Sequence, residues 1–148
     1  MDNAHYYQVD LAWKSDRKGL LQSPTLNTEL EVATPPPFPK GVEGTWSPEH
    51  LLTAAVSSCL MTTFLAIAEN SKLEFESFDC KAAGKLEQVE GKYLMTESLL
   101  EPQVVILREE DKAKAERVIQ KSETACLISN SIKSKVVVKP EILVAKLA

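Results

Sequence analysis

The segment of residues 51–68 constrains this chain most, because it contains no Asp, Glu, Lys or Arg. Just before it, Ser47 is a suitable N-cap residue, Pro48 suits the first helical position, and Glu49 places negative charge near the positive end of a helix dipole. We therefore expect a helix that begins here and ends near Asn70–Ser71. A helix that is apolar on nearly every side must be buried on nearly every side.

Chain length limits how that burial can be achieved. The chain has 148 residues, and a domain usually has ~100–200. We therefore expect one domain, residues 1–148, with one core. A domain of this size can hardly wrap such a helix alone, so we expect a second copy of the chain to help cover it.

Composition argues against several classes of protein. The chain is 44% apolar and 26% charged, which is typical of globular proteins. A net charge of -4 and the lack of any run of four basic residues disfavour nucleic-acid binding. The N-terminus has no basic and apolar leader, and no apolar run is expected to approach the ~18–20 residues that span a bilayer. We expect a soluble cytoplasmic protein that binds neither nucleic acid nor membrane.

The N-terminal third has the pattern of a small sheet followed by a loop. Alternating apolar residues over 7–13 and 26–32 predict two strands, each with one buried face. Residues 15–19 have the composition of a hairpin connection, which leaves room for a short strand at Leu20–Leu21. Arg17 would then lie at or near a strand end. The proline-rich stretch up to Trp46 must be loop.

The C-terminal half predicts a second sheet. Residues 73–88 have strand character, and residues 92–107 form either another strand or a hairpin broken near Glu101–Pro102. Glu90–Gly91 supplies the turn between them. Two short strands around Pro140 end the chain.

Helices are expected between these strands. Acidic residues 109–111 open an amphipathic helix that covers a sheet. A further short helix is expected over 125–132. The sum is an α+β domain.

The three cysteines, Cys59, Cys80 and Cys126, do not fit a secreted disulfide framework, because their number is odd and the chain is long enough to fold without disulfides. This favours a reducing compartment. With no CxxC pair and only His5 and His50, the chain also lacks a credible zinc site. We expect no metal and no organic cofactor.

Cys59 lies in the middle of the apolar helix, and two interpretations of it are open. A buried cysteine most often packs as a small hydrophobic residue. An apolar site also raises the pKa of a thiol, so a reactive Cys59 would need a cation beside it. Cys80 and Cys126 are likewise interpreted first as packing residues. His50 is no partner for Cys59, because nine helical residues place the two on opposite sides of the helix.

Arg17 is the candidate cation. Arg108 and Arg117 lie among other charged residues and are expected to face water. Arg17 is either an ordinary turn residue or a guanidinium that favours the thiolate and hydrogen-bonds a peroxide oxygen. Glu49 could hold it, or could serve only as a charge at the helix start. Because Glu49 and Cys59 lie about 15 Å apart along a helix, the carboxylate and the thiol could come from different subunits.

These residues together resemble the OsmC/Ohr family of osmotically inducible and organic hydroperoxide resistance proteins, most closely its OsmC-like branch. The similarity covers nearly the whole chain: Arg17 to Gly19, the proline-rich loop, Gly44-Thr45-Trp46-Ser47-Pro48-Glu49, the helix with Cys59, and Cys126 with Ser129 and Asn130.

The resemblance implies antiparallel sheets packed around a long buried helix, in an intertwined homodimer. It implies a thiol-dependent peroxidase for organic hydroperoxides, with Cys59 peroxidatic, Cys126 resolving, and Arg17 and Glu49 activating. Cys80 has no counterpart in that scheme. The implied reductant is a lipoylated protein, thioredoxin or a small thiol.

Two features depart from the usual family pattern. Leu127 and Ile128 follow Cys126 where relatives often have a proline and then an aromatic residue or Val, and Ser47 replaces the Asn of the hydroperoxide subgroup. The alternative function is a redox-sensing or small apolar ligand-binding module of the same fold, without turnover. Purely structural thiols are the third possibility.

Overall fold

The computed structural model describes residues 3–146 and shows two sheets with a long helix, so the expected α+β class is confirmed. The chain forms two compact units, residues 1–51 and 52–148. The expectation of a single domain stays a prediction.

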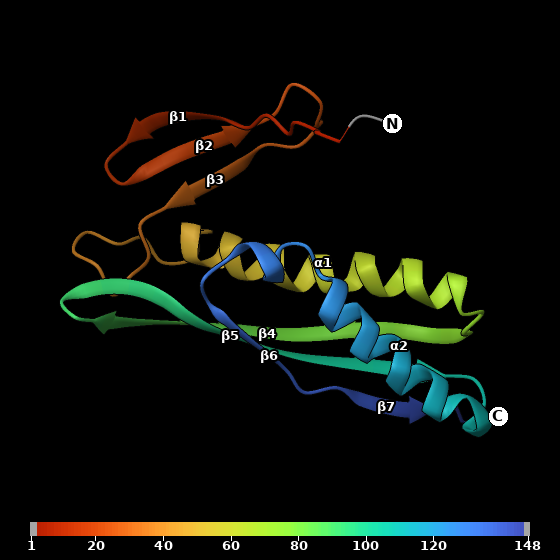
Figure 1. The fold of residues 1–148 in the computed structure, drawn as a ribbon. Coiled ribbons are helices and arrows are strands. Elements are labelled where there is room, and N and C mark those ends of the chain that lie inside the picture. The colour runs from red at the N-terminus through yellow and green to blue at the C-terminus, as the bar shows by residue number, and fades with distance from the viewer. Residues whose placement is uncertain (1–2, 147–148) are drawn as a thin grey trace. The chain divides into compact units, whose positions relative to one another are not determined.

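The first unit holds a three-stranded antiparallel sheet in the order β1-β2-β3 (Figure 1). Its strands are β1 (Asp10–Ser15), β2 (Lys18–Gln22) and β3 (Leu30–Ala33). A two-residue turn joins β1 to β2, and Asp16 adopts a positive φ of 48° there, as tight hairpin turns require. Arg17 is the second turn residue and is exposed, so its predicted place at a strand end is confirmed.

The predicted buried face of the first strand is wrong for the chain as described. All six residues of β1 are exposed, with Leu11 at 66% and Trp13 at 75%. Among the described strands β1 pairs with β2 alone, and it is therefore an edge strand. The alternating pattern correctly indicated a strand, but the described residues do not cover its apolar side chains.

The proline-rich loop returns to β3 before the helix begins. The Val42 N–H donates to the Thr34 carbonyl at 2.9 Å, and the Ala33 N–H donates to the Trp46 carbonyl at 2.8 Å. These bonds fix Ser47, whose fully buried side chain accepts the His50 N–H at 3.2 Å. Ser47 is thus the N-cap, as predicted.

The long helix α1 spans Pro48–Asn70, which agrees with both predicted ends. Its C-terminus forms a Schellman motif: the Leu73 N–H donates to the Ala68 carbonyl and the Lys72 N–H to the Glu69 carbonyl. Lys72 takes the left-handed conformation that this motif needs, with φ 56°. Leu73 is then buried, which fixes the direction in which the chain leaves the helix.

The second unit is built on a long antiparallel hairpin of β4 (Phe75–Val89) and β5 (Lys92–Ile106) (Figure 1). Glu90 and Gly91 form its turn with positive φ angles of 51° and 82°, as predicted. Two short strands, β6 (Lys135–Val138) and β7 (Glu141–Val144), pair with β5 in parallel.

Pro102 does not break β5, so the continuous-strand alternative is confirmed. On one side of β5, β6 pairs with residues 97–100 and β7 pairs with residues 103–106. Pro102 lies between these two stretches, where the chain passes through Lys139–Pro140. Its missing N–H therefore removes no ladder bond on that side.

The second helix, α2 (Lys112–Ala125), follows a 3₁₀ turn at Glu109–Asp111, as the acidic residues indicated. The predicted helix over 125–132 is wrong. Cys126 has an extended backbone, with φ −63° and ψ 107°, which ends α2, and only a 3₁₀ turn at Ser129–Ser131 follows.

The core of the second unit lies between its sheet and its two helices. Buried β5 residues are even-numbered, which places them on one face, and α1 and α2 pack on that face. Phe64 is central: it is fully buried, and its ring centroid lies 5.1 Å from that of Phe75 and 4.8 Å from that of Phe78.

Only one stripe of α1 is buried by the described residues. Val56, Leu60, Phe64 and Ala68 are covered, whereas Met61 is 38% exposed and Leu65 is 42% exposed.

Helix α1 is also long and apolar enough to cross a membrane, since an 18-residue window in it has a mean hydropathy of 1.9. Of that window, 28% is buried inside the structure. The expectation that no segment reaches that length is therefore wrong.

Gly84 on β4 sets how closely α1 approaches the hairpin. A Cβ atom at this position would overlap the Thr53 hydroxyl and lie 2.7 Å from the Met95 methyl group. We expect Gly84→Ala to lower the free energy of unfolding by about 1–3 kcal/mol through overpacking, measured by urea denaturation. Lys81→Ala, at an exposed position of the same strand, is the control and should change it by less than about 0.5 kcal/mol. Equal stability of the two variants would contradict this packing.

Candidate active site

The structure brings Cys59 and Cys126 together, although 67 positions separate them in the sequence. Cys59 lies in the buried stripe of α1 and Cys126 immediately follows α2. Both are free thiols, 8% and 1% exposed, and hydrogen bonding by the Cys126 side chain is one of the causes that lower the pKa of Cys59.

Apolar packing on either side of Cys59 keeps this pair in place. Leu60, next to Cys59, belongs to a core cluster with Val56 and Leu100, and Ile128 packs against the same cluster. The turn that carries Cys126 is therefore anchored by Ile128 two residues later.

Several hydrogen bonds act on the Cys59 sulfur. Burial alone raises the pKa of the Cys59 thiol, but donors oppose it: the backbone of Ile128, the side chains of Cys126 and Thr63, and the backbone of Leu127. The net effect lowers the pKa of Cys59. Hydrogen bonds to the charged form favour ionisation. The sequence argument considered only a cation for this purpose.

Cys126 is held in turn by its own neighbours. The Ser129 hydroxyl donates to the Cys126 sulfur at 3.2 Å, and the Asn130 N–H donates to the Cys126 carbonyl at 3.1 Å. These two contacts use the residues that the family resemblance groups with Cys126.

Arg17 and Glu49 share a cavity in the first unit. This cavity has a volume of about 480 Å³, and its lining is mainly apolar. Its lining includes Trp13, Arg17, Val32, Phe38, Pro48 and Glu49. The structure thus brings together the predicted guanidinium and carboxylate, and separately the two predicted thiols. The action of Arg17 on Cys59 stays a prediction.

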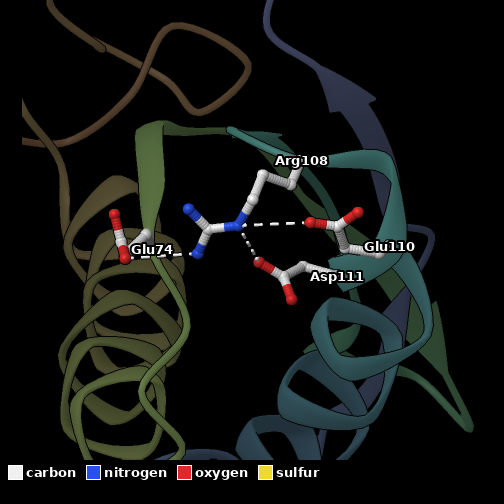
Figure 2. Close-up of polar contacts among 4 residues, drawn as sticks. All are labelled: Glu74, Arg108, Glu110 and Asp111. Carbon is white, nitrogen blue, oxygen red and sulfur yellow. Dashed lines mark hydrogen bonds and ion pairs between the residues drawn. The ribbon is translucent and has the colours of Figure 1, made fainter.

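Arg108 is exposed to solvent, as the sequence indicated, and it also forms ion pairs. Figure 2 shows its guanidinium among three carboxylates, Glu74 at 3.2 Å, Asp111 at 3.3 Å and Glu110 at 3.7 Å. The hydrogen bond to Glu74 is the main cause that raises the pKa of Arg108. Arg108 therefore ties the start of β4 to the turn before α2.

Cys80 is half-buried on β4, and His50 lies in the first turn of α1. Burial raises the pKa of the half-buried Cys80, which makes its thiol a poor nucleophile at neutral pH. The Nδ1 atom of His50 lies 2.7 Å from the Ser47 hydroxyl oxygen, and the His50 ring packs edge-on against Trp46. His50 thus belongs to the helix cap.

Sequence reasoning gave no role beside the thiols to three residues: Thr63, Leu127 and Ile128. Thr63 could have been found, since it lies four residues after Cys59 on the same helix face, and its hydroxyl is 3.9 Å from the sulfur. Leu127 and Ile128 lower the pKa of Cys59 through their backbone atoms. Their side chains therefore do not indicate this effect in the sequence.

The model of the OsmC-like protein family matches residues 41–141, which include α1, both thiols and Glu49. The chain belongs to the OsmC-like protein family. In this fold the apolar helix is a core helix of a soluble protein.

Relatives of this OsmC-like chain agree with the assignment. It is 27% identical over 137 residues to the uncharacterized protein YmaD of Bacillus subtilis, covering 89% of each chain. It matches an OsmC-like protein of unknown function from Vibrio cholerae with a TM-score of 0.82 and 26% identity, over 93% of this chain and 99% of that one. A Legionella pneumophila organic hydroperoxide resistance protein shares the fold, with a TM-score of 0.71 and 20% identity over 95% of this chain and 99% of that one.

Proposed function

We propose that this chain is a thiol-dependent peroxidase that reduces organic hydroperoxides, with Cys59 as the peroxidatic and Cys126 as the resolving cysteine. The observation that carries the proposal is the lowered pKa of the buried Cys59 thiol, to which hydrogen bonding by the side chain of a second buried free thiol, Cys126, contributes. A low-pKa thiolate beside a second thiol is the arrangement that two-cysteine peroxide chemistry needs. The name of the Legionella relative supports the choice of substrate.

The reaction has two steps. The Cys59 thiolate attacks the terminal oxygen of ROOH, the O–O bond breaks, and the sulfur is oxidised to Cys59–SOH while RO⁻ leaves and takes a proton from water. The Cys126 thiol then attacks this sulfenic acid, an S–S bond forms, and water leaves with the thiol proton. A dithiol, or two small thiols, returns two electrons and two protons.

Arg17 and Glu49 form the activating pair in this proposal. Arg17 favours the Cys59 thiolate and donates to a peroxide oxygen, while Glu49 holds the guanidinium. Their shared cavity has apolar walls, which favour an alkyl or lipid hydroperoxide over the small polar hydrogen peroxide.

We further propose that the working form is a homodimer in the cytoplasm. Apolar side chains on β1 and on α1 remain exposed in the single chain, including Leu11, Trp13, Met61 and Leu65. Exposed apolar surface of this kind is typical of a site that binds another protein chain. A second copy of the chain covers the apolar side chains of α1 that one chain leaves exposed. The reductant is a lipoylated protein, thioredoxin or a small thiol.

The proposal is tested by giving the reduced protein cumene hydroperoxide together with dihydrolipoamide, thioredoxin or glutathione. We expect catalytic consumption with at least one reductant, faster than with hydrogen peroxide, and a Cys59–Cys126 disulfide by mass spectrometry. A disulfide without turnover would favour the redox-sensing alternative. Neither disulfide nor turnover would leave the thiols structural.

A further inference from the structure

One row of residues across the three-stranded sheet of the first unit has a glycine at its centre. Trp13 of β1 pairs with Gly19 of β2, and Gly19 pairs in turn with Val32 of β3. Residues directly opposite each other on antiparallel strands project from the same face of the sheet. Trp13 and Val32 therefore flank Gly19 on one face, and the glycine leaves a gap between their side chains.

The same row lines the cavity of about 480 Å³ that contains Arg17. Trp13, Gly19 and Val32 are all among its lining residues. A Cβ atom at Gly19 would lie 3.0 Å from Leu11 Cδ1 and 3.8 Å from Val32 Cγ1, so any side chain at this position would project into the gap. Gly19 is thus the floor of this part of the cavity, and the two flanking side chains are its walls.

Trp13 is held by a hydrogen bond rather than by burial. Its indole Nε1–H donates to the Asp16 carbonyl at 3.1 Å, although 75% of the residue is exposed. Asp16 has a positive φ of 48° in the turn that carries Arg17, so this bond joins the indole to that turn. An aromatic ring whose polar atom is satisfied by the backbone can still stack on another ring through its apolar face. The indole is therefore a fixed wall of the gap.

The width of the gap suits a flat group. Neighbouring strands lie about 4.8 Å apart, so the backbones that carry Trp13 and Val32 are separated by roughly 10 Å. Carbon atoms in contact lie about 3.5–4.0 Å apart, so a planar ring between two walls needs roughly 7–8 Å. The same cavity also holds the charged side chains of Arg17 and Glu49, which suit a polar group attached to such a ring.

We propose that Trp13, Gly19 and Val32 form an aryl-binding slot, which selects hydroperoxides whose organic group carries an aromatic ring. This inference rests on the proposed peroxidase function and narrows its substrate class to aralkyl hydroperoxides. Gly19 and Trp13 are the specificity-determining residues, because the glycine leaves the slot open and the indole stacks on the bound ring. The hydroperoxide group then remains in the cavity that contains Arg17.

Binding of cumyl alcohol, the product of cumene hydroperoxide reduction, tests the slot without any thiol chemistry. The chain has two tryptophans, so Trp46→Phe leaves the fluorescence of Trp13 as the signal for an occupied slot. We expect cumyl alcohol to change this fluorescence. It should bind about 3-fold to 10-fold more tightly than a straight-chain alkanol with the same number of carbon atoms, because only the aromatic ring can stack on the indole.

Gly19→Val fills the slot and should weaken the binding of cumyl alcohol by about 10-fold or more. The new side chain would meet Leu11, which is 66% exposed and has room to move, so the strand should still form. Ala12→Val is the matched control. It adds the same side chain on the opposite face of β1, because neighbouring strand residues alternate between faces, and it should leave the Kd unchanged.

Trp13→Leu, measured by calorimetry, should weaken cumyl alcohol binding by about 3-fold to 10-fold and leave the binding of the straight-chain alkanol nearly unchanged. Circular dichroism and size-exclusion chromatography check that each variant keeps its fold and oligomeric state. Equal affinity of the unaltered protein for the two alcohols overturns the slot. Unchanged binding in folded Gly19→Val, or in Trp13→Leu if the valine variant does not fold, overturns it as well. Cumyl alcohol does not react with thiols, so a chain that binds it but consumes no peroxide would disprove the proposed function alone.

Discussion

Cys59→Ser is expected to abolish the consumption of cumene hydroperoxide, leaving only the rate measured without protein. A serine hydroxyl does not ionise near neutral pH, and its oxygen cannot pass through the sulfenic acid that carries the two electrons from the peroxide. The groups around this position would be unchanged, so the loss of peroxide consumption would be due to the missing sulfur. The measurement is the steady-state decrease of peroxide with the reductant that supports the unaltered protein.

Two matched variants control this result. Cys80→Ser changes a thiol whose pKa is raised by burial, and it should retain full turnover. Cys126→Ser should consume one equivalent of peroxide and then stop, with Cys59 trapped as sulfenic acid by a dimedone reagent. Full turnover by Cys59→Ser would show that another group performs the chemistry.

Local signals in the sequence predicted the secondary structure that positions the thiols. Ser47 and Pro48 carry their own start signal, so α1 begins where expected. Glu90 and Gly91 likewise specify a tight hairpin turn. Residues 126–128 were predicted as helix and are not, because the extended conformation of Cys126 depends on packing against another part of the chain.

Burial was less predictable than secondary structure. The alternating residues of β1 suggested a buried face, yet Leu11 and Trp13 are exposed, because a period of two identifies a strand without saying what covers it. For α1 the sequence correctly indicated more apolar surface than one chain can cover. Met61 and Leu65 remain exposed there.

The candidate site was predicted as residue types and only in part as geometry. The contact between Cys59 and Cys126 depends on how α2 packs on the sheet, which no local pattern encodes. The backbone donors of Leu127 and Ile128 were equally invisible, since every residue except proline has an N–H. The lowered pKa of Cys59 thus has causes that a search for cations could not reveal.

Arg17→Ala is expected to raise the pKa of Cys59, because a neighbouring opposite charge favours the thiolate. A raised pKa leaves less thiolate at neutral pH, so alkylation at pH 7 should slow by about 10-fold to 1000-fold and equal that of the unaltered protein in strong base. Arg17 is exposed in a two-residue turn, so the variant should fold normally. The measurement is the rate of Cys59 alkylation against pH.

Arg17→Lys separates charge from geometry. Lysine keeps the positive charge but loses the planar fork that pairs with a carboxylate and a peroxide oxygen. The Cys59 midpoint should therefore stay near its original value while the KM for hydroperoxide rises. Unchanged alkylation in Arg17→Ala would remove Arg17 from thiolate stabilisation and leave hydrogen bonding as the cause of the lowered Cys59 pKa.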